Sequence, residues 1–179
     1  MQLCRLHIMG ASGSGTTTLG RAIANAWSVP HADSDDYFWV PTSPPYTTPR
    51  PVPERIGLMR TMFVPRDAWV LSGAINGWAG AVLEECDAVV FLTLDPQERM
   101  RRLAARETLR RGGDIEDQAT TEFMQWARGY DDPEFMGRSR RAHEDWLASI
   151  PQPVLRLDSG RPVADLKDEV LAWEPALGG

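Results

Sequence analysis

The feature that most constrains this chain is a glycine-rich stretch between a short apolar run and an amphipathic segment. Residues 3–9 (LCRLHIM) are mostly apolar, residues 10–18 read GASGSGTTT, and Leu19, Ile23 and Trp27 follow at helical spacing. This order predicts a buried strand, a tight turn and a helix. Glycines let the backbone amides of such a turn face inward, and the start of the helix adds unpaired N–H groups. We therefore expect the turn to surround an anion.

The stretch fits the phosphate-loop pattern G-x-x-x-x-G-K-[ST] except at one position. Gly10, Gly15 and Thr17 match, and Thr16 stands where the pattern has lysine. Lysine brings positive charge to the β- and γ-phosphates of a nucleotide, whereas threonine brings only a hydroxyl. Three interpretations follow: nucleotide binding with an arginine supplying the charge, nucleotide binding without catalysis, and a turn that binds no phosphate. We favour phosphate binding by the whole loop, which comprises Gly10, Ala11, Ser12, Gly13, Ser14, Gly15, Thr16, Thr17 and Thr18.

A dinucleotide-binding fingerprint, G-x-G-x-x-G, is a further alternative for the same stretch. It would need Gly13, Gly15 and a glycine at position 18, where the chain has Thr18. We therefore rank it below the phosphate loop.

Strand-like and helical patterns alternate along the rest of the chain. Short apolar runs lie at 69–71, 88–94 and 154–157, with amphipathic segments between them. In the segment after the second of these runs, Met100, Leu103 and Ala104 are expected to form the buried helix face. The alternation predicts an α/β fold with three layers, α/β/α, around a five-stranded, mostly parallel sheet. A length of 179 residues suits a single domain over 1–179.

A group of aspartates follows the first predicted helix. The sequence HADSDD at 31–36 predicts a short strand that ends near Asp33. In extended backbone Asp33 and Asp35 lie on the same side, and ligands of parallel sheets bind at the carboxyl ends of the strands. Carboxylates at that edge hold Mg²⁺ or take a proton from an attacking hydroxyl. A turn in which these aspartates only cap the next segment is the alternative.

Composition narrows the function classes. The formal net charge of −6 argues against a protein whose main partner is nucleic acid. Two cysteines give no disulfide framework or zinc pattern, and no apolar run is long enough for a membrane helix. We interpret the N-terminus as a strand rather than a signal peptide, and we expect a cytoplasmic protein without a membrane partner. Nothing in the sequence fixes the oligomeric state.

Two irregular segments interrupt the alternation. Residues 40–53 (VPTSPPYTTPRPVP) contain too many prolines for a regular helix or a central strand, and residues 110–118 (RRGGDIEDQ) form a polar segment broken by glycines. Long irregular loops often cover ligands, although they also serve as plain surface connections. We expect 36–65 to be an acceptor-binding region and about 106–140 to be a lid.

These residues together resemble the small P-loop kinases, namely the nucleoside monophosphate, shikimate and gluconate kinases. The order of motifs is also similar to that of topology modulation proteins of the same kinase-like group, and archaeal cytidylate kinases carry a similar GSGTTT loop. The resemblance implies a P-loop NTPase fold with ATP and Mg²⁺ as cofactors. It implies that Thr17 and Asp33 serve the metal, and that Asp35 holds or deprotonates the acceptor.

The resemblance extends to the later segments. It implies that the third strand ends in a glycine turn at the acceptor, here Gly73, and that a helix of spaced arginines leads into the lid. Arg106 and Arg110 are then expected at the transferring phosphoryl group. A second cluster, Arg138, Arg140 and Arg141, would reach the phosphates if its helix packs over the site, and solvated helix faces are the alternative for any of these arginines. The remaining expected ligand contacts are Arg102, Arg161 and Pro162 for the nucleotide, and Asp36, Trp39 and Arg60 for the acceptor.

The sequence thus predicts an ATP-dependent phosphotransferase with a small acceptor, for which a nucleoside monophosphate is one candidate. A nucleotide-binding protein without kinase activity and a slow NTP hydrolase are the alternatives, and both are motivated by Thr16.

Overall fold

A computed structural model describes residues 1–43, 45–110 and 118–175 of the chain. Its centre is a five-stranded sheet in the order β2-β3-β1-β4-β5, in which every pairing is parallel. The α/β prediction with a mostly parallel sheet is therefore confirmed. The strands are β1 (Arg5–Gly10), β2 (His31–Asp33), β3 (Trp69–Ser72), β4 (Ala88–Thr93) and β5 (Val154–Asp158).

Helices connect successive strands, as parallel pairing requires. In chain order they are α1 (Thr16–Trp27), α2 (Ser34–Phe38), α3 (Val52–Met62), α4 (Gly80–Leu83), α5 (Pro96–Arg110), α6 (Gln118–Arg128), the short 3₁₀ helix η1 (Gly129–Asp131), α7 (Arg140–Ser149) and α8 (Val163–Ala172). None of the helices in these described ranges is both long and apolar enough to cross a membrane.

Alternate residues of each strand pack against different helices. On one face of the sheet, Leu6 and Ile8 of β1 lie in a buried cluster with Leu19 and Ile23 of α1 and Val170 of α8. Burial of these side chains is the main favourable term that holds the two helices to the sheet.

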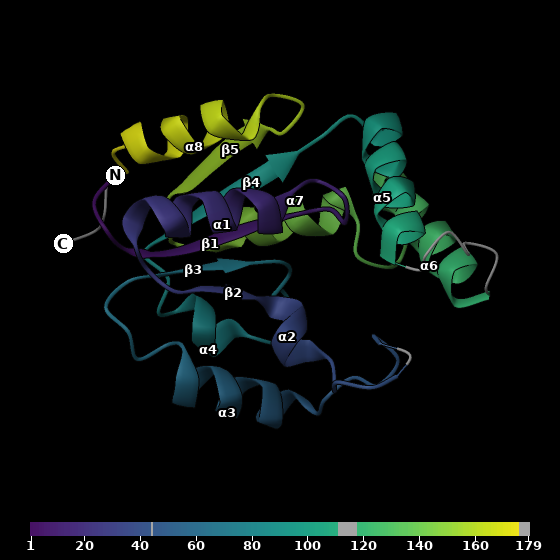
Figure 1. The fold of residues 1–179 in the computed structure, drawn as a ribbon, viewed down its shortest axis with the longest axis horizontal. Helices are drawn as coiled ribbons and strands as arrows, with labels where there is room; N and C mark the ends of the chain where they lie inside the picture. The colour runs from purple at the N-terminus through teal and green to yellow at the C-terminus, as the bar shows by residue number, and fades with distance from the viewer. Residues whose placement is uncertain (44, 111–117, 176–179) are drawn as a thin grey trace.

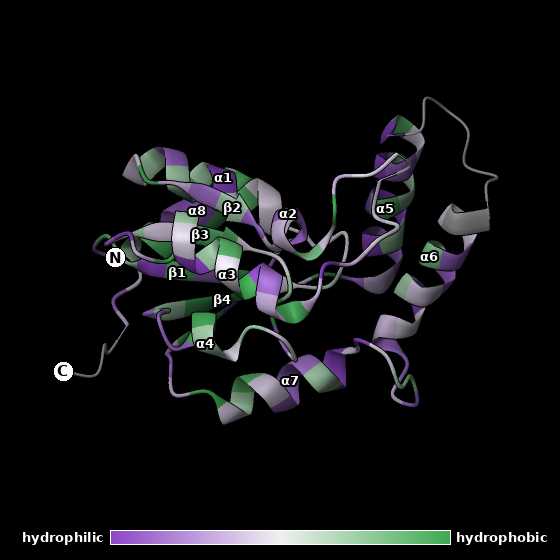
Figure 2. Cartoon of the chain, turned by 90° about the horizontal axis from the view of Figure 1, so that it is seen from below, coloured by the Kyte–Doolittle hydropathy of each residue, from purple (hydrophilic) through white to green (hydrophobic). Residues whose placement is uncertain are grey.

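The opposite face is covered by α3, α4 and α7. Met59 of α3 and Leu71 of β3 belong to one buried cluster there, while Leu147 of α7 packs with Met9 and Phe91 in another. Figure 2 shows α1 and α7 on opposite sides of the sheet. The predicted three-layer arrangement is thus confirmed.

The carboxyl ends of the strands define the edge that matters for function. The loop after β1, helix α2 and the start of α5 all lie at this edge, and α5 and α6 stand side by side beyond it (Figure 1). Residues from distant parts of the sequence therefore meet where parallel sheets bind ligands.

The prediction for the buried face of α5 was wrong in part. Its buried side chains are Arg99, Leu103 and Glu107, whereas Ala104 is exposed and Met100 is only partly buried. The helix packs against α6 rather than lying flat on the sheet, so the buried face includes charged residues that pair or hydrogen-bond locally.

The proline-rich segment forms a return of the chain rather than a helix or a strand of the sheet. A single antiparallel bridge joins Trp39 to Pro49, and the amide of Val40 donates to the carbonyl of Thr48. Residues 111–117 of the predicted lid lie outside the described residues.

Candidate active site

The loop between β1 and α1 has the backbone shape of an anion-binding turn. Gly13 and Gly15 adopt positive φ angles of 89° and 90°, which L side chains rarely adopt. A Cβ on Gly10 would lie 2.7 Å from the carbonyl oxygen of Leu92, so β1 and β4 leave no room for a side chain there. A Cβ on Gly15, by contrast, would meet nothing within 4 Å. The loop is therefore packed tightly against β4 at Gly10 and has free space beside Gly15.

The start of α1 and the hydroxyl of Ser14 are left without side-chain partners, as a site for a phosphate requires. No side chain caps the N-terminus of α1, and no acidic residue lies in its first turn. The buried hydroxyl of Ser14 has no hydrogen-bond partner in the described structure. Free N–H groups at a helix start favour negative charge. The residues present therefore fit a phosphate group.

Thr17 of α1 and Asp33 of β2 are joined at this edge of the sheet. The hydroxyl of Thr17 donates a hydrogen bond of 2.6 Å to Oδ2 of Asp33, and Oδ1 of the same carboxylate accepts from the amide of Asp35 at 3.1 Å. Hydroxyl and carboxylate oxygens are ligands that suit Mg²⁺. The described residues contain no cluster of three or more His, Cys, Asp or Glu able to hold a metal. This pair therefore fits a magnesium ion that takes its other ligands from phosphate and water.

Asp35 lies in a crowded but water-accessible position at the start of α2. Desolvation by the surrounding protein raises the pKa of its carboxyl above the ordinary value, and the charge of Asp33 adds to the rise. The positive charges of Arg138, Arg106 and Arg110 oppose that shift, so all three arginines lie within electrostatic reach of the carboxylate. The structure therefore places Asp33, Asp35 and both predicted lid arginines in one region. A carboxyl with a raised pKa is suited to accept a proton.

Arg106 and Arg110 already have an acidic neighbour. Both lie within ion-pair distance of the buried carboxylate of Glu107, at 3.0 Å and 3.3 Å. The guanidinium of Arg110 also lies 5.3 Å from the ring centre of Tyr46, so the end of α5 meets the proline-rich segment. Glu107 thus neutralises part of their positive charge, and the remainder acts on the carboxylate of Asp35.

Arg138, a member of the second arginine cluster that the sequence offers as a contact to the phosphates, contacts the phosphate loop directly. Its Nη2 donates a hydrogen bond of 2.7 Å to the hydroxyl of Ser12, although the two residues are 126 positions apart. The guanidinium lies 4.8 Å from the ring centre of Trp126, and its Nε is buried without a partner. This residue precedes α7, whose N-terminal end lies at the same edge of the sheet as the loop (Figure 1).

Arg99 of α5 also binds the phosphate loop, through the backbone of Ser12. Its side chain is 2% exposed and donates to the carbonyl oxygens of Ser12 and Ala127 at 3.2 and 2.9 Å. An ion pair of 2.9 Å joins it to Asp131, which also pairs with Arg140 at 2.7 Å. This network fixes η1 and the start of α7 against the phosphate loop.

The three residues predicted to contact the nucleotide, Arg102, Arg161 and Pro162, lie on or beside the loop that follows β5. Arg102 pairs with the acid four residues earlier and donates to the carbonyl of Ser159 at 3.0 Å, which brings α5 to the loop after β5. Pro162 stands at the N-terminal cap of α8. Arg161 forms an ion pair of 2.6 Å with Glu169 and is half exposed. The structure thus brings Arg102 to this loop and leaves Arg161 engaged with α8.

The turn after β3 is confirmed as a glycine turn next to Asp33. Gly73 has a φ of 99°, and a Cβ there would overlap the side chain of Ser34 and lie 3.2 Å from Oδ1 of Asp33. Its carbonyl accepts a hydrogen bond of 2.8 Å from Nε2 of His7. Nε2 of His31 lies 2.9 Å from the hydroxyl of Ser72.

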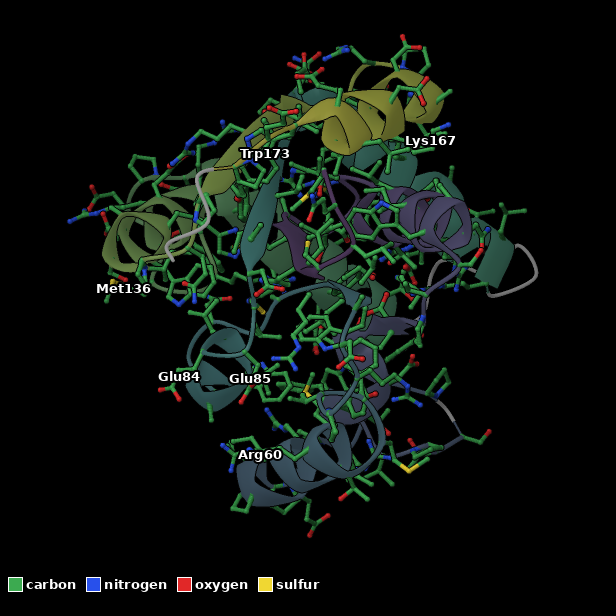
Figure 3. The ribbon with its side chains drawn as sticks, turned by 90° about the vertical axis from the view of Figure 1, so that its left-hand side faces the viewer. Arg60, Glu84, Glu85, Met136, Lys167 and Trp173 are labelled. Carbon is green, nitrogen blue, oxygen red and sulfur yellow. The ribbon has the colours of Figure 1, made fainter. Side chains whose placement is uncertain are left out.

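The expected acceptor residues do not all gather at this turn. Arg60 is exposed near the C-terminal end of α3, on the side of the molecule where the strands begin (Figure 3). Asp36 is exposed on α2, and Trp39 is half-buried, with its ring centre 4.7 Å from that of Phe38. The structure therefore separates Arg60 from Asp35.

A different arginine of α3 lies by α2. Arg55 is 7% exposed, its guanidinium carbon lies 3.6 Å from the ring centre of Phe38, and its Nε donates to the carbonyl of Arg50 at 2.6 Å. Burial lowers its pKa, and no carboxylate contributes to that shift. Sequence reasoning missed this residue, because only the packing of α3 shows which arginine of the helix faces inward.

The fold and the loop together define the class as the P-loop kinase fold. A sugar kinase from Janibacter sp. HTCC2649 matches with a TM-score of 0.56 and 17% identity, covering 99% of both chains. A shikimate kinase from Bacteroides thetaiotaomicron matches with 0.56 and 18% over 95% of this chain and 99% of that one. A gluconokinase from Sinorhizobium meliloti 1021 matches with a TM-score of 0.55 and 19% identity, covering 94% of this chain and 90% of that one.

Sequence relatives place the chain more narrowly. The chain is 36% identical over 173 residues to "Uncharacterized protein YqaC" of Bacillus subtilis (strain 168). The matched region covers 94% of this chain and 96% of that protein, so the chain belongs to the same family. A cytidylate kinase of Methanocorpusculum labreanum is 30% identical over 116 residues, or 59% of this chain and 64% of the relative. No family model matches the sequence.

Proposed function

We propose that this protein transfers the γ-phosphoryl group of Mg²⁺-bound ATP to a hydroxyl of a small anionic acceptor. The observation that carries the proposal is the connection from Thr17 through Asp33 to Asp35, which links the phosphate loop to a carboxyl with a raised pKa. The phosphate loop, the oxygen pair proposed to bind the metal and the proposed proton acceptor are thus neighbours along one chain of hydrogen bonds. The kinase fold of the sugar, gluconate and shikimate kinases supports the same assignment.

Each group has a defined part in the transfer. The loop from Gly10 to Thr18 binds the phosphate tail through its amides, and Thr17 and Asp33 hold the metal. The bound metal supplies positive charge that neutralises the phosphate oxygens. Asp35 accepts the proton of the acceptor hydroxyl as that oxygen bonds to the γ-phosphorus, and the bond from this phosphorus to the bridging oxygen of ADP breaks. Arg106 and Arg110 stabilise the negative charge on the phosphoryl group that is transferred.

The acceptor end of the site carries its own positive charge. Arg55 has no ion pair among the described residues, and it stacks on Phe38, which lies three residues, and so about one helical turn, from Asp35. A buried guanidinium without an acid partner favours an anionic ligand. We infer that the acceptor carries a carboxylate or phosphate together with its hydroxyl. Nucleoside monophosphates and sugar acids both meet this requirement, and Gly73 keeps the floor of the turn free of a side chain.

A coupled assay of ADP release tests the proposal. The purified protein is mixed with ATP and Mg²⁺ and with a panel of nucleoside monophosphates, sugar acids, hydroxy acids and neutral sugars as acceptors. We expect turnover that depends on an anionic acceptor and that is lost in Asp35→Asn. Phosphate release that no acceptor stimulates would instead identify a hydrolase. ATP binding without either product would identify a nucleotide-binding protein.

A further inference from the structure

The phosphate loop lacks a lysine, and the rest of the chain does not supply one to it. The only lysine of the sequence is Lys167. It lies on α8 and pairs with Asp168 at 2.8 Å, and Figure 3 shows it on the far side of the molecule from α3. A cation that meets the β- and γ-phosphates must therefore be an arginine.

Most arginines near the loop are already committed to protein partners. The guanidinium of Arg99 is bound to two carbonyls and Asp131 and is almost fully buried. Arg102 is held by Glu98, and Arg106 and Arg110 share the carboxylate of Glu107. An arginine that is paired with a carboxylate presents less net charge to a ligand than an unpaired one.

Arg138 differs from all of these. In the part of the chain that the structure describes, it forms no ion pair, and its contact with the loop is a hydrogen bond to the neutral hydroxyl of Ser12. Its Nε is buried and lacks a partner. The ring of Trp126 holds the guanidinium in place by a cation–π contact. The full positive charge therefore remains available beside the loop.

The same guanidinium lies within electrostatic reach of Asp35 as well as beside the loop, because each of the two charges acts on the other. Burial lowers the pKa of Arg138 from its ordinary value, and the charge of Asp35 acts in the opposite direction. A guanidinium stays protonated in proteins, so the group acts as a permanent cation between the loop and Asp35.

We propose that Arg138 takes the place of the missing loop lysine and binds the β- and γ-phosphate oxygens of the nucleoside triphosphate. Its planar fork can donate two parallel N–H bonds to phosphate oxygens, with Ser12 and Trp126 holding it in place. This inference rests on the proposed function, and it assigns the triphosphate tail, rather than the acceptor, as the ligand of Arg138.

Nucleotide affinities test the assignment. Calorimetric titrations with Mg²⁺ and ATP, ADP or AMP are compared for the wild type, Arg138→Met, Arg138→Lys and the control Arg141→Met. Arg141 is three residues away, its side chain is 75% exposed, and it lies 3.8 Å from the carboxylate of Asp145. We expect Arg138→Met to weaken ATP binding about 10- to 100-fold and AMP binding hardly at all. Arg138→Lys is expected to lie between, and Arg141→Met to match the wild type.

A rescue variant makes the test specific to the missing lysine. Thr16→Lys is combined with Arg138→Met, and thermal unfolding confirms that each variant is folded. We expect the double variant to recover the preference for ATP over AMP, because lysine then occupies its usual place in the loop. A double variant that binds ATP no better than Arg138→Met overturns the inference.

The outcomes separate this inference from the proposed function. A wild type that binds ATP, together with an Arg138→Met protein whose ATP-to-AMP ratio is unchanged, overturns the role of Arg138 alone. The same result with a raised KM for an anionic acceptor assigns Arg138 to the acceptor and also overturns it. A wild type that binds no nucleotide overturns the proposed function, and this inference with it.

Discussion

The hydroxyl of Thr17 and the carboxylate of Asp33 are joined by a hydrogen bond of 2.6 Å across the carboxyl edge of the sheet. Thr17 belongs to the first turn of α1, and Asp33 is the last residue of β2. The second oxygen of this carboxylate accepts from the amide of Asp35, so one side chain orients both the metal side and the acceptor side of the site. A change at either end is therefore expected to affect the other.

Removal of the Thr17 hydroxyl is expected to weaken magnesium-dependent nucleotide binding. Thr17→Val keeps the shape of the side chain but loses the ligand oxygen and the bond to Asp33. We expect the affinity for ATP in the presence of Mg²⁺ to fall about tenfold or more. With EDTA in place of Mg²⁺, the variant and the wild type are expected to bind ATP with similar affinity. Calorimetry with and without Mg²⁺ measures both, and Thr17→Ser is the matched control that keeps the hydroxyl. Equal magnesium dependence in the valine variant would contradict the metal role.

Neutralisation of Asp35 is expected to act on the chemical step. Asp35→Asn keeps the size of the side chain and removes the proton acceptor, so kcat is expected to fall about 10²- to 10⁴-fold with little change in the KM for ATP. Because the pKa of this carboxyl is raised, the acid limb of the pH–rate profile is expected above the ordinary aspartate range. Asp36→Asn serves as the control, since it removes the next carboxylate along α2 and leaves the Asp35 carboxyl in place. An Asp35→Asn variant within a few-fold of wild-type kcat would rule out the proton-acceptor role.

The parts of the site that depend on local order could be predicted from the sequence. The loop at Gly10, the strand that ends at Asp33 and the glycine turn at Gly73 each follow from a few adjacent residues whose backbone preferences agree. The run Asp95-Pro96-Gln97-Glu98 likewise predicts a helix start with an aspartate cap, and Oδ1 of Asp95 accepts from the amides of Gln97 and Glu98 at 3.0 Å.

The parts that depend on how helices dock could not be decided from the sequence. The sequence offers Arg138 only as one of three clustered arginines, and it meets Ser12 because η1 and α7 fold back onto the loop, over a separation of 126 residues. For a related reason the sequence pointed to Arg60 and did not show that Arg55 is the buried arginine of α3, since this helix has almost no amphipathic pattern to show which side faces the sheet. Similarly, Arg99 is buried within α5 because α6 and Asp131 supply its partners.

Gly73 is expected to tolerate no side chain. Its φ of 99° is strained for any L residue, and a Cβ would overlap Ser34. We expect Gly73→Ala to lower the free energy of unfolding by about 2 kcal/mol or more, as measured by urea denaturation. The control is Gly57→Ala in α3, where a Cβ meets nothing within 4 Å and alanine is expected to stabilise by about 0.5–1 kcal/mol. Equal effects of the two substitutions would contradict a steric role for Gly73.

Two buried histidines are expected to make stability depend on pH. Burial lowers the pKa of His7 to about 4 and that of His143 to about 3, and Nδ1 of His143 lies 3.0 Å from the hydroxyl of Tyr130. The unfolded chain, with histidine pKa values near 6.5, binds more protons than the folded chain at pH values between these limits. The free energy of unfolding is therefore expected to fall as the pH drops from about 6.5, by on the order of 2 kcal/mol per histidine at pH 5.

His143→Gln isolates one of these contributions. Glutamine keeps a hydrogen-bonding group for Tyr130 but does not titrate, so about half of the histidine contribution to the fall between pH 7 and pH 5 should disappear. Urea denaturation at both pH values measures this difference within each protein, so any uniform cost of the substitution cancels. Between pH 7 and pH 8 the two proteins should change almost in parallel, because both histidines are neutral in the folded chain and mostly neutral in the unfolded one. Equal losses of stability on acidification would show that His143 binds its proton as readily in the folded chain as in the unfolded one.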